Sequence, residues 1–255
     1  LTIQEGCDKF CKFCVVPYTR GAEFSRSIDE LIKEAKQLVD NGSKEITLLG
    51  QNVNAYNFEE KNLSDLIFQI AKIKGLKRIR YTTSHPRDFT KELIEIHGDC
   101  EKLMPLIHLP VQTGSNKVLE NMNRKHTIEE YLEIIEQLKN VKPNIELSSD
   151  FIIGYPGETQ YDFEQTVNLM KKVKFINSYS FIFSPRPGTP AFNLKTVDEN
   201  LAKERLIIFQ DISKKIKTEY RAKLLTKTKP VLFENKTKQG SQFFGRDEHY
   251  NSVIV

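Results

Sequence analysis

Six strand-like apolar runs alternate with segments of helical periodicity through most of the 255-residue chain. In the segment 128–141 the apolar residues recur at helical spacing, and Thr127 is expected to cap that helix. This alternation favours a parallel sheet with helices packed outside it. The predicted strands are 1–4, 46–49, 79–83, 106–109, 145–153 and 176–183, and the predicted helices are 28–39, 63–73, 89–97, 128–141, 159–173 and 198–225.

The number of strand–helix units decides between a closed and an open architecture. Eight units would close a (β/α)8 barrel, whereas six predict an α/β fold of the partial (β/α)6 type. In such folds the chemistry takes place at the carboxyl ends of the strands. The segments that follow the predicted strands are polar and rich in glycine and proline, which favours an active site there: Cys7, 50–54, 84–85, 112–115, 150–158 and 184–189.

Composition excludes several classes of protein. Hydrophobic residues make up 39% and charged residues 28%, which suits a globular protein with a full core and excludes collagen-like and wholly disordered chains. No run approaches 18 apolar residues, so no membrane span is expected. The net charge of +4 is mild and does not by itself require a nucleic-acid partner.

Three of the four cysteines, Cys7, Cys11 and Cys14, lie in one short segment directly after the first predicted strand. A structural zinc site needs four ligands, and neither Cys100 nor a histidine lies in a paired motif that would supply the fourth. Three thiolates fit a 4Fe–4S cluster in which one iron lacks a protein ligand. An open metal position favours catalysis, although a structural zinc site or buried thiols remain alternatives. Cys100 is expected to be inert.

The Cys-x3-Cys-x2-Cys spacing resembles that of the radical S-adenosylmethionine (SAM) enzymes, and further motifs resemble the methylthiotransferases among them. The resemblance implies a six-unit partial barrel, a 4Fe–4S cluster on Cys7, Cys11 and Cys14, and SAM bound through its amino and carboxylate groups to the open iron. One electron from the cluster would then split SAM and yield a 5′-deoxyadenosyl radical. The segments that carry the likeness are 6–21, 49–56, 82–86, 108–115, 149–159 and 186–191.

The resemblance also implies roles for residues near the cysteines. Gly50 and Gln51 stand where radical SAM enzymes commonly carry a Gly-Gly-Glu motif that touches the SAM amino group. Gly50 permits close backbone approach, and Gln51 keeps a carbonyl acceptor without the charge. Phe13 is expected to stack on the adenine of SAM. The alternatives are a plain turn glycine at Gly50 and ordinary core packing of Phe13.

Three more residues are implied to bind SAM. Gln112 and Asp150 would hydrogen-bond the ribose hydroxyls, for which an amide and a carboxylate are suitable. Arg124 lies twelve residues after Gln112, where a related barrel enzyme places an arginine on the SAM carboxylate. A solvated arginine beside Lys125 is the alternative. His108 shares a strand face with Gln112 and is the one histidine for which a site role is considered.

A basic region follows the last predicted helix. Residues 214–238 carry nine lysines and arginines against two glutamates. In the methylthiotransferases this position begins a TRAM domain, a small RNA-binding β-barrel, so Lys223, Lys227 and Lys229 are expected to contact RNA phosphates. A solvated helix face is the alternative. The predicted domains are a radical SAM core at 1–225 and a truncated start of a TRAM-like barrel at 226–255.

The likeness is closest to the MiaB-type tRNA enzymes, which add a methylthio group at C2 of N6-isopentenyladenosine next to the anticodon. It implies a cytoplasmic, monomeric enzyme with tRNA as partner and flavodoxin or ferredoxin as electron donor. The alternatives are a radical SAM enzyme that modifies another RNA base or a ribosomal protein, and a non-catalytic iron–sulfur fragment. The full-length family carries an auxiliary 4Fe–4S cluster, for which this chain has only Cys100 to spare, and one thiol cannot hold such a cluster. The 255 residues alone are therefore expected to cleave SAM slowly at best and to make no methylthiolated adenosine.

Overall fold

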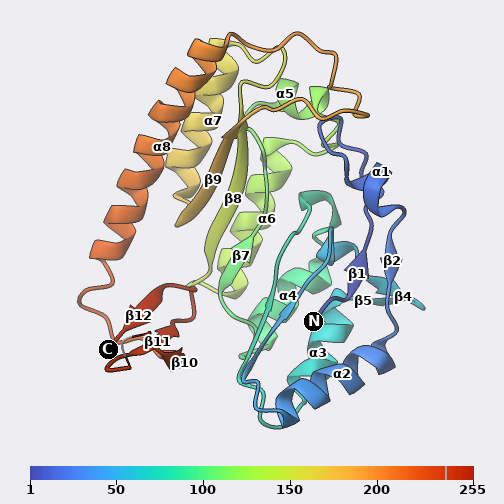
Figure 1. Cartoon of the computed structure of the whole chain (residues 1–255), viewed down its shortest axis with the longest axis vertical. Coiled ribbons are helices and arrows are strands. Elements are labelled where there is room, and N and C mark those ends of the chain that lie inside the picture. Colours follow the sequence, from blue (N-terminus) through green and yellow to red (C-terminus); the bar gives the residue numbers. More distant parts are fainter. Residues whose placement is uncertain (239) are drawn as a thin grey trace.

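Parallel strands form the centre of the computed structural model, which describes residues 1–238 and 240–255. β3 pairs in parallel with β6, and β7, β8 and β9 form a second parallel sheet. Parallel bridges from Thr2 to Leu49 and from Ile79 to Leu103 connect the succession. The sheet curves without closing (Figure 1), so the predicted partial barrel is confirmed. The strands are β1 (Gln4–Glu5), β3 (Glu45–Leu48), β6 (Arg78–Tyr81), β7 (Leu106–His108), β8 (Glu146–Ile153) and β9 (Asn177–Ile182).

The helices cover the convex side of the sheet (Figure 1) and begin within one residue of the predicted start, except α4, which begins two residues later than predicted. Thr127 and Thr159 each form a capping box. The threonine side chain accepts from the backbone N–H of the third helical residue, and the acidic side chain of that residue accepts from the backbone N–H of the threonine. Asn41 caps the carboxyl end of the first long helix. The long helices are α2 (Ile28–Asp40), α3 (Leu63–Ala71), α4 (Lys91–Asp99), α6 (Ile128–Val141), α7 (Gln160–Val173) and α8 (Glu199–Ala222).

Several short elements have too little periodicity to be predicted from sequence. One strand pairs antiparallel with β1 and carries the chain back from the cysteine segment. A small hairpin precedes α3. These elements are α1 (Val16–Arg20), β2 (Phe24–Ser25), the 3-10 turn η1 (Val53–Ala55), the hairpin of β4 (Asn57–Phe58) and β5 (Lys61–Asn62), the 3-10 turn η2 (Pro86–Asp88) and α5 (Asn116–Asn121).

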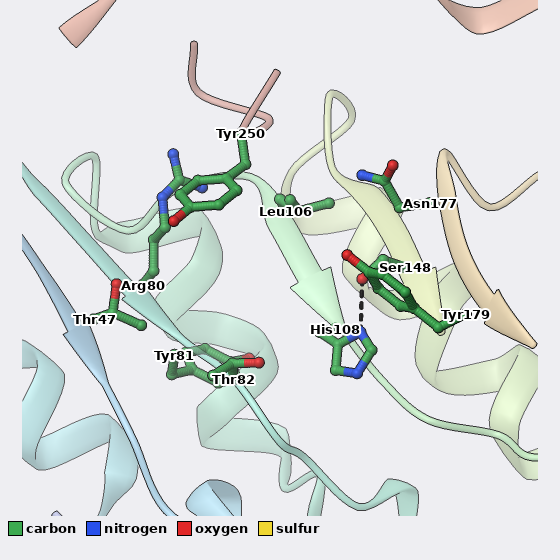
Figure 2. Close-up of a pocket in the computed structure, with 10 residues that line it drawn as sticks. All are labelled: Thr47, Arg80, Tyr81, Thr82, Leu106, His108, Ser148, Asn177, Tyr179 and Tyr250. Atoms are coloured by element: carbon green, nitrogen blue, oxygen red, sulfur yellow. Dashed lines mark hydrogen bonds between the residues drawn. The ribbon is translucent and has the colours of Figure 1, made fainter. Parts of the chain in front are cut away.

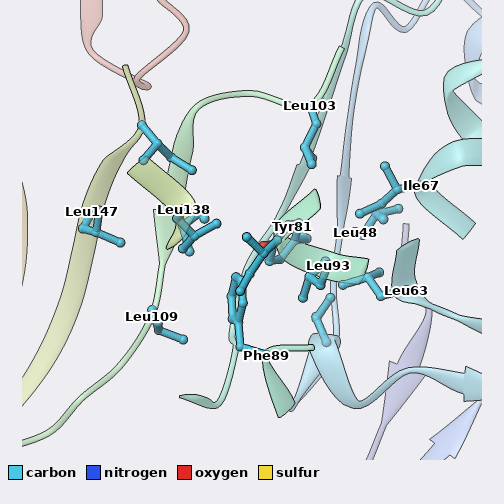
Figure 3. Close-up of a cluster of buried hydrophobic side chains, with 14 of the residues drawn as sticks. Leu48, Leu63, Ile67, Tyr81, Phe89, Leu93, Leu103, Leu109, Leu138 and Leu147 are labelled. Carbon is cyan, nitrogen blue, oxygen red and sulfur yellow. The ribbon is translucent and has the colours of Figure 1, made fainter. Parts of the chain in front are cut away.

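The main hydrophobic core lies between the convex face of the sheet and the helices (Figure 3). Burying one large apolar side chain stabilises the fold by about 1.5–3 kcal/mol, and dozens are buried here. Successive side chains alternate across a strand, so the residues between these core positions point into the barrel. Strand and helix residues that meet in this core include Leu48, Leu63, Ile67, Tyr81, Leu93, Leu109, Leu138 and Leu147.

The C-terminal segment forms a separate antiparallel sheet of β10 (Leu232–Lys236), β11 (Phe243–Arg246) and β12 (Ser252–Ile254). Figure 1 places it near the C-terminal end of α8. Buried Arg78 of β6 donates to the backbone carbonyls of Pro230, Arg246 and Asp247 at 2.8–3.2 Å. This sheet therefore packs against the amino end of the barrel strands.

Candidate functional site

Local backbone geometry shapes the cysteine segment between β1 and α1. Gly6 has a φ of 74°, and a Cβ there would lie 2.0 Å from the carbonyl oxygen of Ala22, so only glycine fits. The Cys7 amide donates to the Gly21 carbonyl at 3.2 Å. The Lys12 amide donates to the carbonyl of Met122, just after α5, at 3.0 Å. The segment is thus held at both ends at the carboxyl edge of the barrel.

The three thiols of this segment are free and sheltered. Cys11 is buried, and Cys7 and Cys14 are partly buried. Burial raises the pKa of Cys7 to about 11 and also raises the pKa of Cys14. Thiolates in this setting would need positive charge nearby, which bound iron supplies.

A single metal ion does not match this arrangement. Within residues 1–238 and 240–255, no group of three or more His, Cys, Asp or Glu side chains is positioned to hold one ion. A four-iron cluster is wider than one ion, so its cysteine ligands stand farther apart than those of a lone zinc. A donor set of three thiols fits iron–sulfur ligation by chemistry.

Arg124 lies against Cys11, and its predicted contact with the SAM carboxylate stays a prediction. Its guanidinium is buried, and one terminal nitrogen donates to the Sγ of Cys11 at 3.6 Å while the other donates to the Pro110 carbonyl at 2.5 Å. Its Nε is buried with no hydrogen-bond partner among the described residues. The alternative of a solvated arginine is excluded by this burial.

Two buried histidines, which the sequence did not single out, lie near Arg124. The rings of His85 and His126 meet edge to face with centroids 5.7 Å apart. Burial and the charge of Arg124 lower the pKa of both, and that of His126 falls to about 4. Both rings are therefore neutral at physiological pH, and the Nε2 atom of each lacks a partner among the described residues. Asn54 fixes the backbone of His85 through two hydrogen bonds of 2.8 Å.

Gly50 and Gln51 contact β1 and the start of the cysteine segment. A Cβ at Gly50 would lie 2.7 Å from both the backbone and side-chain oxygens of Gln4, a fully buried residue. The side-chain oxygen of Gln51 accepts from the amide of Gly6 at 2.8 Å. In this structure both residues shape the turn that leads into Cys7, and their predicted contact with the SAM amino group stays a prediction.

Gln112, beyond the end of β7, lies beside Asp150 in β8. The Gln112 amide donates to the Asp150 carbonyl at 3.0 Å, and Gln112 has a φ of 77°, which is uncommon for a residue with a side chain. The Asp150 carboxylate is 3.5 Å from His108 Nε2. The structure thus brings the pair together, and their binding of the SAM ribose stays a prediction.

Phe13 packs at the edge of a second hydrophobic cluster, so its core-packing interpretation holds at least for part of the ring. That cluster joins α5 to the loop beyond β9 through Val118, Met122, Tyr155, Phe183 and Ala191. Phe13 remains partly exposed. Stacking on adenine stays a prediction.

An ion-pair network beside Cys7 was also missed by sequence reasoning. Lys9 contacts Asp88 at 2.8 Å and Glu23 at 3.9 Å. The Asn52 amide nitrogen donates to the same two carboxylates at 2.7 and 3.1 Å. These partners are 14 to 79 residues from Lys9 in the chain, so no local pattern could reveal them.

The predicted RNA-binding lysines lie between α8 and β10. Lys223 and Lys227 are exposed. Lys229 instead forms an ion pair with Glu248, with 2.6 Å between Nζ and Oε1. Lys223 and Lys227 are therefore accessible to a partner, whereas Lys229 is paired within the C-terminal segment.

Comparisons with known proteins agree with this geometry. Residues 1–170 match the family described as the Radical SAM superfamily. The whole chain is 58% identical to a tRNA-2-methylthio-N(6)-dimethylallyladenosine synthase of Pelagibacter ubique and 56% identical to that of a Wolbachia pipientis strain. It spans 58% and 59% of their lengths.

Solved structures support the fold alone. The methyltransferase TsrM from Kitasatospora setae aligns over 75% of this chain and 38% of its own, with a TM-score of 0.63 and 16% identity. Coproporphyrinogen III oxidase from Escherichia coli aligns over 84% of this chain and 51% of its own, with a TM-score of 0.62 and 14% identity. No described helix is both long and apolar enough to cross a membrane. The family match over two thirds of the chain, on a barrel whose cysteines lie at its carboxyl edge, shows that the chain belongs to the radical SAM superfamily.

Proposed function

We propose that this chain is the SAM-binding barrel of a tRNA methylthiotransferase that modifies C2 of N6-isopentenyladenosine next to the anticodon. The observation that carries the proposal is the sheltered trio Cys7, Cys11 and Cys14, with Arg124 against Cys11 at the carboxyl end of the barrel. The names of relatives that are more than half identical over the whole chain support the choice of reaction.

The side chains divide the work of binding. Cys7, Cys11 and Cys14 would hold the 4Fe–4S cluster, and Arg124 would pair with the SAM carboxylate through its guanidinium fork. Gln112 and Asp150 would hold the ribose. When bound, the cluster and SAM supply the radical that removes the hydrogen atom from C2.

The surrounding residues position these groups and limit water. Gly6, Gly50 and Gln51 set the path of the chain into Cys7. Neutral His85 and His126 add no positive charge beside Arg124, so the guanidinium remains the main local cation for an anionic ligand.

The remaining assignments follow from the proposed function. Residues 226–255 would be the beginning of a TRAM-like RNA-binding domain, since their antiparallel sheet follows a basic segment. Lys223 and Lys227 would contact the tRNA backbone. Flavodoxin or ferredoxin would supply the electron, in a cytoplasmic, monomeric enzyme.

The test is anaerobic reconstitution of the complete gene product that contains this chain. The protein is incubated with SAM, a reductant and tRNA that carries isopentenyladenosine, and the nucleosides are analysed by mass spectrometry. We expect 5′-deoxyadenosine together with methylthiolated isopentenyladenosine. Methylthiolation of a different base or of a ribosomal protein would contradict the substrate, and stoichiometric zinc without acid-labile sulfide would contradict the cofactor.

A further inference from the structure

A cavity of about 250 Å³ lies on the concave face of the barrel, between the strands and the C-terminal segment (Figure 2). Toward the carboxyl ends of the strands its wall contains His108, Ser148 and Tyr179. At the opposite end its wall contains Leu106 and Tyr250 together with Arg80 and Asn177. Hydrogen-bonding side chains thus line both ends, and at the end away from the cysteines Leu106 and the Tyr250 ring supply the apolar surface.

The end on the side of the cysteines holds an ordered group of side chains. His108 Nδ1 and Ser148 Oγ are 2.7 Å apart, and His108 Nε2 lies 3.5 Å from the Asp150 carboxylate. The Tyr179 ring meets the His108 ring edge to face, with centroids 6.1 Å apart, and is 55% exposed. Hydrogen-bonding groups beside an exposed aromatic face are what a nucleic-acid base needs in order to bind.

Tyr250 reaches the other end of the cavity from the turn between β11 and β12. Its φ of 65° is unusual for a bulky residue and stores backbone strain. Asp247 holds the turn, because its carboxylate accepts from the amides of His249 and Asn251 at 2.9 and 2.8 Å. The Tyr250 ring lies 4.8 Å from the Arg80 guanidinium, which fixes it against β6. The hydrogen bonds of Asp247 and the contact with Arg80 thus hold the Tyr250 ring at one end of the cavity in spite of this strain.

We propose that this cavity binds the N6-substituted adenine of the RNA substrate, with the base beside His108 and Tyr179 and the hydrocarbon substituent against Leu106 and Tyr250. This inference rests on the proposed function. Tyr250 would then make the C-terminal segment a determinant of substrate specificity. Each methylene group moved from water into such a cavity raises affinity roughly fourfold, so partial burial of the five-carbon group gives a preference of about tenfold.

The experiment measures RNA binding to the complete, cluster-loaded gene product. Two labelled anticodon hairpins are compared, identical except that one carries N6-isopentenyladenosine and the other adenosine. We expect the wild-type protein to prefer the substituted hairpin about tenfold. Tyr250→Ala should reduce the preference to about twofold by weakening only the substituted RNA, whereas Tyr250→Phe should retain it. Tyr161→Ala, which removes a 68% exposed ring from α7, is the matched control and should leave both affinities unchanged.

Because Tyr250→Ala could misfold the C-terminal segment, a second variant changes the cavity from the barrel side. Leu106→Phe adds bulk inside the cavity from β7 and should also lower the preference without weakening the unsubstituted hairpin. The inference is wrong if both variants keep the wild-type preference, or if the wild-type protein has none. The methylthiolation assay on the wild-type protein separates the two failures. Product formation together with an unchanged preference would contradict only this use of the cavity, whereas absence of product would contradict the proposed function.

Discussion

The two ends of the barrel differ in how fully their buried arginines are hydrogen-bonded. At the amino end, every terminal nitrogen of Arg78 and Arg80 donates to a backbone carbonyl of the C-terminal segment within 3.2 Å. At the carboxyl end, the Nε of Arg124 and the Nε2 atoms of His85 and His126 have no partner among the described residues. A buried polar group without a partner costs about 1–3 kcal/mol. At the amino end the arginines therefore hold the C-terminal segment to the barrel. At the carboxyl end, polar groups remain to which a ligand could hydrogen-bond.

The largest expected effect tests the carboxyl end. In the 255-residue chain, replacing Cys7, Cys11 or Cys14 by alanine should reduce bound iron and sulfide, and with them SAM cleavage, to background, since all three thiolates are needed to hold the cluster. Iron and sulfide analysis and 5′-deoxyadenosine assays measure this. Cys100→Ala is the matched control, because Cys100 is buried at the end of α4 and should leave the iron content unchanged. A cysteine variant that keeps its full iron content would show that the ligands lie elsewhere.

The next effect tests cohesion at the amino end. Arg78→Ala removes three hydrogen bonds. The carbonyls of Pro230 and Arg246 lose this donor, whereas the Asp247 carbonyl keeps its bond from Arg80. We expect the free energy of unfolding to fall by about 2–4 kcal/mol, with faster proteolysis of the C-terminal segment. Urea denaturation measures the change. Arg87→Ala removes an exposed arginine and should stay within about 0.5 kcal/mol of wild type. Equal effects of the two variants would remove the distinction between the ends.

The elements of the convex layer could be predicted because their signals are local. The helix 128–141 begins and ends as predicted. Its N-cap Thr127 and the capping box lie directly before the apolar pattern that marks the helix. The prediction of a helix from residue 89 was early by two residues, because Thr90 caps α4, which begins at Lys91. The cysteine segment was equally visible, because all its thiols lie within one short stretch.

The groups that complete the two ends could not be predicted, because their partners are distant in the chain. The contact between Arg80 and Tyr250 joins residues 170 positions apart. The pairing of His85 with His126 joins the loop after β6 to the loop between α5 and α6. The closeness of Gly50 to Gln4 likewise became visible only in three dimensions. Sequence periodicity predicts which face of an element is buried, but it does not predict which polar groups meet inside the barrel.

A smaller effect concerns pH and His126, whose Nε2 has no hydrogen-bond partner among the described residues. Burial lowers the pKa of His126 to about 4, whereas an unfolded histidine titrates near 6.5. Between these values the unfolded chain binds more protons, so stability should fall as the pH falls from about 6.5 to 4, by up to about 1.4 kcal/mol per pH unit for this residue.

His126→Gln tests this assignment in the cluster-free protein. The variant should show a shallower loss of stability in that pH window, measured by urea denaturation at several pH values. His85, His97 and His249 also have lowered pKa values and should preserve the remaining slope. An unchanged slope in His126→Gln would mean that this ring is not held neutral by the fold.

The smallest expected effect is a difference in the salt dependence of tRNA binding between exposed lysines and a lysine that is paired within the C-terminal segment. Lys223 and Lys227 are exposed, whereas Lys229 is paired with Glu248 at 2.6 Å. A lysine that neutralises one phosphate contributes about 0.9 to the slope of log affinity against log salt concentration. Lys223→Ala and Lys227→Ala should each lower the slope for tRNA binding by about that amount, whereas Lys229→Ala should lower it by less than half as much, since its charge is already compensated. Fluorescence anisotropy with labelled tRNA between 50 and 200 mM salt measures the slopes. If Lys229→Ala has the largest effect, its pair with Glu248 opens on RNA binding, and this part of the C-terminal segment is an RNA-binding surface.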